Sequence, residues 1–454
     1  MTHQAQQGPG SLFSLTWPLF IDIALHFATG AMNTFMMGQI NFADVAALAV
    51  GNQVFDLAIT VFSFVSIGSS VVLTQYLGAK RYDDAKVVIH SAISFNLLIG
   101  LLAAIVILSG AGPILQTMNL PAHLLGDGEL YLTIIGLCLL PEAAALCLAA
   151  TLRAHGHTRQ AMYATLLVNL VTFISNLTLL YGWFGIPQFG VAGVAISTVV
   201  GRITGIVFLV WLVQKRAGIQ LVPTLLLRPS KDKLRKVLHI GLPAAGENLS
   251  WMLQFMVITA FVGLLGETSL ATHSYYFQIC LFMMLFGISI GLGNEIIIGY
   301  LIGGRQFESA YARLLKTLKL GIGVTFVVAL CASFIGRQAV SFFSDDQTII
   351  QQISMLFLIS IIMEPGRTFN LVVINALRAT GDARFPLMMA LCSMWGIAVP
   401  LAYYFGIHSG MGLVGIWIGL ACDEWVRGLA MLWRWRSRRW QSKSLIDDST
   451  PLPQ

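Results

Sequence analysis

The chain has 454 residues, of which 56% are hydrophobic and only 11% are charged, and its net charge is +6. Because roughly a quarter of the residues of a globular protein are charged, this composition excludes a soluble domain and indicates a membrane protein. The excess of Lys and Arg is then a signal of membrane topology and not of nucleic-acid binding.

Apolar segments of about 20 residues, the length that crosses a hydrocarbon core of ~30 Å, occur twelve times along the chain. Breaks of polar, Gly and Pro residues separate them. The expected helices are residues 13–38, 46–77, 87–111, 128–153, 161–183, 190–214, 237–264, 270–302, 314–336, 347–377, 385–406 and 412–433. We therefore predict an all-α integral membrane protein with twelve transmembrane helices.

Basic residues occur in every second connection between these helices, and such residues stay on the cytoplasmic side. One set of connections contains Lys80, Arg81 and Lys86, then Arg153 and Arg159, seven basic residues between 215 and 236, Arg305 to Lys316, Arg378 and Arg384, and finally Arg434 to Lys443. The opposite set contains only Arg337. We predict a multi-pass protein of the cell (inner) membrane with both termini in the cytoplasm. The alternation of Trp and Arg from Trp433 to Trp440 is typical of an interfacial anchor.

The second half of the chain resembles the first at a fixed distance along the sequence, which we call the repeat offset. It aligns Leu152 to Gly156 (LRAHG) with Leu377 to Gly381 (LRATG), and GAKRYDDA from Gly78 with GGRQFESA from Gly303. The same offset pairs Pro18 with Pro243 and Asp22 with Glu247. Such a repeat indicates two six-helix halves. Because six is even, both halves have the same orientation, and secondary transporters with parallel repeats place their site between the halves.

The repeat divides the chain into four parts. We predict an N-terminal lobe at 1–214, a basic cytoplasmic linker at 215–236, a C-terminal lobe at 237–433 and a cytoplasmic tail at 434–454.

Two acids are expected at the depth of the membrane midplane, where an ionisable residue costs at least ~2.5 kcal/mol and therefore indicates function. Asp22 and Glu247 each lie about ten residues, or roughly 15 Å, into their helices. At 100° per residue, each acid shares one helix face with polar or aromatic residues. These residues are His26, Thr29 and Asn33 in the first helix, and Trp251 and Gln254 in the seventh. Two facing polar stripes predict a cavity.

Other polar residues inside the membrane are candidates for the same cavity. Glu364 and Arg367 lie one helical turn apart and form either part of the transport site or a static ion pair. Further candidates are Gln53, Asp56, Glu142, Tyr275, Gln278 and Glu295, together with Asp423 and Glu424 beside Arg427. The six cysteines lie singly in apolar segments, so we expect neither a metal site nor a disulfide framework.

These motifs resemble the multidrug and toxic compound extrusion (MATE) family of antiporters, in nearly the whole chain. The resemblance rests on the 6+6 repeat, the Leu-Arg-Ala-x-Gly signatures, Gly-Ala-Lys-Arg-x-x-x-Ala after the second helix, and Gly241-Leu242-Pro243 with Glu247. It implies a V-shaped pair of six-helix lobes that exports amphipathic, often cationic, compounds against H⁺ or Na⁺. Many members have an Asp where this chain has Asn33, which cannot titrate. Asp22, on the same face, is the available substitute.

The resulting hypothesis is an exporter that alternates access between two lobes, with Asp22, Glu247 and Glu364 as ion-coupling residues. The coupling ion is H⁺ or Na⁺, and Na⁺ would bind at Asp22 or Glu247. We expect no cofactor, and the partners are a small-molecule substrate and the lipid bilayer, with no nucleic acid and no obligate protein partner.

A flippase for lipid-linked sugars is the nearest alternative, although it needs a more cationic cavity for pyrophosphate. A major-facilitator carrier is disfavoured, because the loop after the second helix lacks that family's Asp-Arg-x-Gly-Arg-Arg run. The sequence has neither the clustered Asp or His residues of a membrane-embedded enzyme nor a phosphate-binding Gly-x-x-x-x-Gly-Lys loop. We therefore predict that the protein is not an enzyme.

Overall fold

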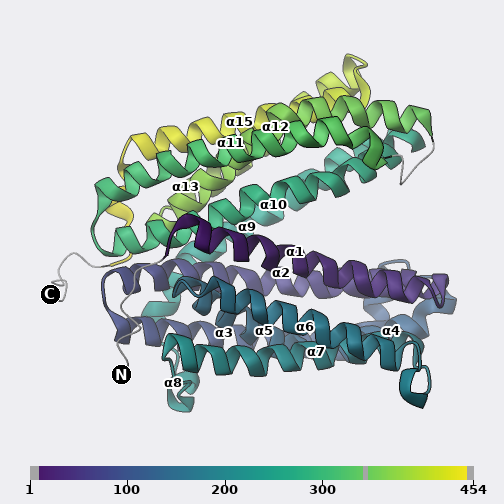
Figure 1. The fold of residues 1–454 in the computed structure, drawn as a ribbon, viewed down its shortest axis with the longest axis horizontal. Helices are drawn as coiled ribbons and strands as arrows, with labels where there is room; N and C mark the ends of the chain where they lie inside the picture. Colours follow the sequence, from purple (N-terminus) through teal and green to yellow (C-terminus); the bar gives the residue numbers. More distant parts are fainter. Residues whose placement is uncertain (1–9, 341–345, 447–454) are drawn as a thin grey trace. The chain divides into compact units, whose positions relative to one another are not determined.

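A computed structural model describes residues 10–340 and 346–446, and in this part of the chain the regular structure is helical throughout. Figure 1 shows the helices. They are α1 (Leu12–Gly38), α2 (Phe42–Gly78), α3 (Tyr82–Thr117), α4 (Leu125–Gly136), α5 (Leu139–Ala154), α6 (Thr158–Leu179), α7 (Gly190–Leu212), α8 (Pro223–Leu227), α9 (Lys231–Gly263), α10 (Glu267–Gly303), α11 (Phe307–Val340), α12 (Gln347–Thr380), α13 (Arg384–Ser393), α14 (Val399–Tyr403) and α15 (Gly412–Arg436). Residues 1–9 of the predicted first lobe and 447–454 of the predicted tail lie outside the described residues.

Each of the twelve predicted segments corresponds to a helix or to a broken helix. Within the described residues, nine helices are long and apolar enough to cross a membrane, and the bent pair of α4 and α5 brings the number to ten. α9 and α15 do not reach this threshold. α9 begins with a basic stretch, and α15 contains Asp423, Glu424 and Arg427. These two helices complete the predicted twelve.

The prediction of one continuous helix over 128–153 is wrong. The chain breaks after Gly136 and bends by 47° between α4 and α5. Pro141, in the first turn of α5, has no N–H to donate to the carbonyl four residues earlier, so an uninterrupted helix would lose a hydrogen bond here. The predicted helix over 385–406 is likewise interrupted, by π-helical turns at Met394–Ala398 and Tyr404–His408.

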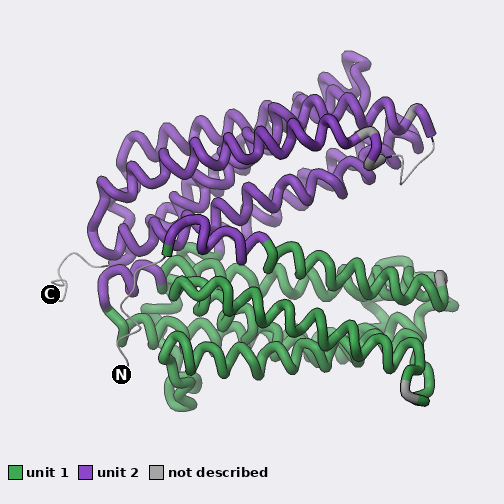
Figure 2. Tube along the Cα trace, in the orientation of Figure 1, with its two compact units in different colours: residues 1–10, 21–73, 81–241 green, residues 11–20, 74–80, 242–454 purple. Residues whose placement is uncertain are grey.

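The described chain forms two compact units, which Figure 2 colours separately. Of the described residues, unit 1 contains Gly10, 21–73 and 81–241, and unit 2 contains 11–20, 74–80, 242–340 and 346–446. The first turns of α1 therefore pack with unit 2, whereas the rest of α1 packs with unit 1. The predicted linker 215–236 is partly helical, because it contains α8 and the start of α9.

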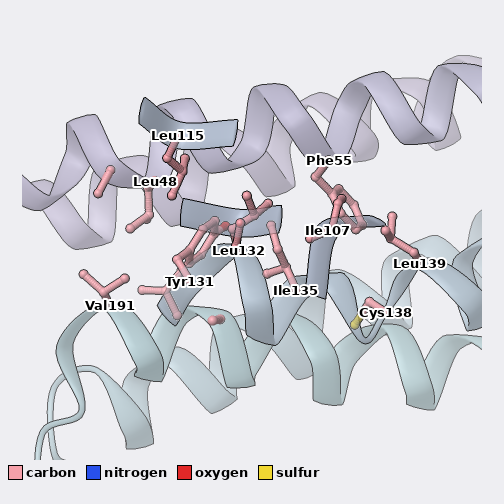
Figure 3. Close-up of a cluster of buried hydrophobic side chains, with 14 of the residues drawn as sticks. Leu48, Phe55, Ile107, Leu115, Tyr131, Leu132, Ile135, Cys138, Leu139 and Val191 are labelled. Atoms are coloured by element: carbon pink, nitrogen blue, oxygen red, sulfur yellow. The ribbon is translucent and has the colours of Figure 1, made fainter. Parts of the chain in front are cut away.

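A buried apolar core holds the helices of unit 1 together. Figure 3 shows its side chains, among them Leu48 and Phe55 of α2, Ile107 of α3, and Tyr131 and Leu132 of α4. Full burial of such a side chain contributes about 1.5–3 kcal/mol relative to exposure to water. The core holds these helices together around the polar residues described below.

Small residues let α2 and α10 approach closely within unit 2. A Cβ on Gly303 would lie 2.0 Å from the Gln75 carbonyl oxygen, and a Cβ on Gly299 would lie 2.1 Å from Thr74 Oγ1. Gly299 and Gly303 form the Gly-x-x-x-Gly spacing that permits close backbone contact between membrane helices. A larger side chain at either position would push the helices apart.

The end of the chain packs against unit 2. Arg438 adopts a left-handed φ of 57°, which turns the chain back after α15, and its guanidinium binds the Glu308 carboxylate. Trp440 then stacks on Trp435 with ring centroids 4.3 Å apart, and both side chains are fully buried. The interfacial-anchor interpretation is therefore wrong for these two tryptophans. Only Trp433, which is 59% exposed, is placed as an anchor would be.

We expect Trp440→Ala to destabilise the protein by about 3–5 kcal/mol, because it removes a buried aromatic ring and leaves a cavity. The measurement is the apparent melting temperature of the detergent-solubilised protein. Trp433→Ala is the matched control, since its exposed ring has little packing to lose. Equal melting temperatures for the two variants would contradict the buried packing of the chain end.

Candidate functional site

Unit 1 contains a cavity of about 670 Å³ between α1, α2, α4, α5, α6 and α7. The predicted α1 stripe lines it, with Asp22, His26, Thr29 and Asn33 all facing the same space. This arrangement confirms that the four residues share a helix face. It follows from the helical period, because residues three or four apart on a helix lie on one side.

Asp22 is buried at the inner wall of this cavity and has two strong partners. Arg153 Nη1 lies 3.2 Å from one carboxylate oxygen, and Thr165 Oγ1 donates a hydrogen bond of 2.5 Å to the other. His26 Nε2 lies 4.0 Å from the carboxylate, and 55% of its side chain is exposed. The acid is therefore held in an ion pair, with a titratable imidazole at its open side.

A neighbouring layer of the cavity is uncharged and hydrogen-bonded. Thr29 donates a hydrogen bond of 2.7 Å to Asn169 Oδ1. Asn33 donates to Thr198 Oγ1 at 3.2 Å and accepts from Asn176 Nδ2 at 2.8 Å. The amide at position 33 thus takes part in a buried polar network that needs no charge.

A second ion pair lies in the same cavity. Arg202 is 2.5 Å from the Glu142 carboxylate, and its guanidinium packs over the Phe55 ring at 4.7 Å from the centroid. Asp56 of α2 also lines the cavity and is an exposed residue. The lining therefore contains three carboxylates but only two guanidinium groups, and its net charge is negative when His26 is neutral.

Unit 2 contains a counterpart of the Asp22 pair. Arg378 Nη2 donates a hydrogen bond of 2.7 Å to Glu247 Oε2, and both residues are buried. Each pair joins residues 131 positions apart. The repeat offset relates Asp22 to Glu247 and Arg153 to Arg378, so both halves of the repeat contain the same acid–arginine pair.

Sequence reasoning did not assign a site role to either arginine. Both stand in the Leu-Arg-Ala-x-Gly signatures that established the repeat. The signal that could have found them is the shared offset itself, because two acids and two arginines in the same register are expected to form the same contact in each half.

The Glu364–Arg367 pair belongs to a larger buried network between α12 and α15. Arg367 Nη1 donates a hydrogen bond of 2.7 Å to Glu364, and its Nε lies 3.6 Å from Glu424. Arg427 contacts both Asp423 and Glu424, at 2.9 and 3.0 Å. These contacts fit a set of ion pairs that ties the two helices together.

The remaining predicted residues are not among those lining the unit 1 cavity. Gln53 and Gln278 are exposed, and Tyr275 packs against the apolar core of unit 2. Trp251 stacks on Phe255 with centroids 5.8 Å apart, and Gln254 is buried. The predicted stripe on α9 is therefore occupied by aromatic packing after Glu247.

His155, two residues after Arg153, lies in the connection between α5 and α6. Burial lowers its pKa to about 4, and its Nδ1 lies 2.8 Å from the Thr151 carbonyl oxygen. Its imidazole is therefore neutral near pH 7. Within the described part of the chain, no group of three or more His, Cys, Asp or Glu side chains is placed to hold a metal ion.

The MatE family model matches residues 18–178 and again residues 243–404. The chain belongs to this family. The two matches begin at Pro18 and Pro243, which are the positions that the repeat offset pairs. The family assignment makes this MatE protein a multi-pass membrane transporter and not an enzyme, as predicted.

Similar proteins and structures cover nearly the whole of the MatE chain. It is 40% identical to "Uncharacterized transporter YisQ" of Bacillus subtilis (strain 168) over 96% of each chain. It is 23% identical to "Probable multidrug resistance protein NorM" of Thermotoga maritima, over 96% of this chain and 94% of that one. A crystal structure of MATE in the bent conformation has the same fold, with a TM-score of 0.88, 18% identity and coverage of 96% of this chain and 98% of that chain.

Proposed function

We propose that this MatE protein exports amphipathic, cationic small molecules across the cell (inner) membrane in exchange for H⁺ or Na⁺, by alternating access. Both termini would lie in the cytoplasm. The name of the NorM relative supports the multidrug substrate range. The observation that carries the proposal is the acid–arginine pair that recurs in both halves, one copy of which lines a cavity with more carboxylates than guanidinium groups.

Such a pair can exchange its counterion. A proton or Na⁺ on Asp22 would satisfy the carboxylate without Arg153, and the guanidinium would then be released from its partner. Because a charge left unpaired in a membrane is costly, the occupied and empty states favour different arrangements of the surrounding helices. We assign the coupling role to Asp22 and Glu247. Glu364, the third predicted coupling residue, is bound to Arg367 within the α12–α15 network.

The energy available suffices for export. One charge that moves down a membrane potential of 100 mV releases ~2.3 kcal/mol. At about 1.4 kcal/mol per factor of ten, this corresponds to a concentration gradient of roughly fiftyfold for each net positive charge that enters. Because an outgoing monocation offsets one incoming coupling ion, the membrane potential contributes only when a second coupling ion enters, and a one-for-one exchange is driven by the concentration gradient of the ion.

A flippase for lipid-linked sugars remains the alternative function. A pyrophosphate group needs cationic partners, whereas both arginines that line the cavity already bind carboxylates. The charge of the cavity therefore favours a cationic substrate.

The test is efflux of the cation ethidium by the full-length protein in proteoliposomes, with pH and Na⁺ gradients imposed separately. We expect efflux to follow one gradient and to stop when an ionophore dissipates it. The gradient that supports efflux identifies the coupling ion. The proposal would be overturned if efflux were independent of both gradients, or if the efflux rate equalled that of protein-free liposomes.

A further inference from the structure

The carboxylates of the unit 1 cavity are not equivalent. Asp22 is neutralised by Arg153 at 3.2 Å, and Glu142 by Arg202 at 2.5 Å. Arg202 also interacts electrostatically with Asp56, but it forms its ion pair with Glu142. Across residues 10–340 and 346–446, however, no hydrogen bond or ion pair engages its carboxylate. The cavity thus has one uncompensated negative charge, at Asp56.

The surroundings of Asp56 fit an apolar cation. Phe27, Ile59 and the ring of Tyr131 line the same cavity, and the Tyr131 hydroxyl is occupied by a hydrogen bond of 2.7 Å to Asn52. Binding sites for small molecules combine such apolar walls with a few placed polar groups that fix orientation. Aromatic rings also attract a cation that lies over their faces. The volume of about 670 Å³ is within the range of small-molecule sites.

We propose that Asp56 anchors the positive charge of the substrate and that the cavity selects organic cations with a single charge. This inference rests on the proposed function and names the residue that recognises the substrate. One uncompensated carboxylate can balance one positive charge. A second charge on the same ligand would lose its water without gaining a partner, because Asp22 and Glu142 are already paired, and an unpaired desolvated charge is unfavourable.

The test measures binding of two dyes that share a phenanthridinium ring, the monocation ethidium and the dication propidium. Titration of the detergent-purified full-length protein, followed by dye fluorescence anisotropy, gives both dissociation constants. For the wild type we expect ethidium to bind at least about tenfold more tightly than propidium, a difference of about 1.4 kcal/mol. Propidium binding as tight as ethidium, or no binding of either dye, would overturn the inference.

Variants then assign the preference to Asp56. Asp56→Asn is expected to weaken ethidium binding at least about tenfold, whereas Asp56→Glu retains it. Asp127→Asn is the matched control, because Asp127 is exposed and is not among the lining residues. Unchanged ethidium affinity in Asp56→Asn would overturn the assignment.

A second variant tests the charge count without altering Asp56. Glu142→Gln removes the partner of Arg202 and frees the guanidinium to neutralise Asp56, so ethidium should again bind at least about tenfold more weakly. Tight ethidium binding in Glu142→Gln would contradict the proposal that one uncompensated carboxylate binds the cation. This test holds even if Asp56→Asn proves too unstable to purify.

These experiments test the Asp56 anchor and the proposed export function independently of each other. If the wild type binds ethidium through Asp56 but shows no gradient-driven efflux, the anchor stands and the proposed function falls. If the wild type exports ethidium and Asp56→Asn binds it equally well, the function stands and the anchor falls.

Discussion

Asp22→Asn is expected to abolish gradient-driven efflux and to leave only the leak measured in protein-free liposomes. The asparagine side chain can still accept the hydrogen bond from Thr165, but it can neither take up a proton nor neutralise Arg153. The variant therefore has no exchange of counterions with which to couple the gradient to substrate movement. The measurement is initial efflux rate under the gradient that drives the wild type.

Asn33 offers a control for this result. It lies on the same face of α1, and it already contacts Asn176 and Thr198. Adding Asn33→Asp to Asp22→Asn restores one titratable carboxylate to the cavity, so partial recovery of efflux is expected. Undiminished efflux in Asp22→Asn alone would contradict the coupling role of Asp22.

Arg378→Ala is expected to destabilise the protein by about 3–5 kcal/mol, because removal of one partner from a buried ion pair leaves the other charge uncompensated. The remaining charge is Glu247, and both side chains of this pair are only 10% exposed. Glu247→Gln in the same background removes that charge and should recover most of the loss. The readout is the apparent melting temperature in detergent, together with the yield of monodisperse protein.

The repeat supplies a matched comparison. Arg153→Ala disrupts the equivalent pair in the other half, but 26% of the Arg153 side chain is exposed and its cavity can admit water to the freed Asp22. We therefore expect Arg153→Ala to cost less stability than Arg378→Ala. A larger loss for Arg153→Ala would show that the burial of the pair does not determine its contribution.

Much of the architecture could be predicted from the sequence because it depends on local composition and on period. Apolar length predicted all twelve helical segments, and the repeat offset predicted the duplication that the two family matches confirm. The helical period alone placed Asp22, His26, Thr29 and Asn33 on one face. The interruption of the fourth segment could also have been predicted, because Pro141 has no N–H to continue the backbone hydrogen bonds of α4.

The sequence by itself thus determined the helices, the duplication and the polar face of α1. Only the tertiary structure decided which charges meet. All twelve segments are apolar, so hydropathy does not say which of them are neighbours, and lipid gives no hydrophobic preference among helix contacts. The pairing of Asp22 with Arg153, 131 residues away, requires the C-terminal end of α5 to lie within side-chain reach of α1. The burial of Trp435 and Trp440 likewise depends on tertiary structure. The chain turns back at Arg438, and this turn lets both side chains pack within unit 2.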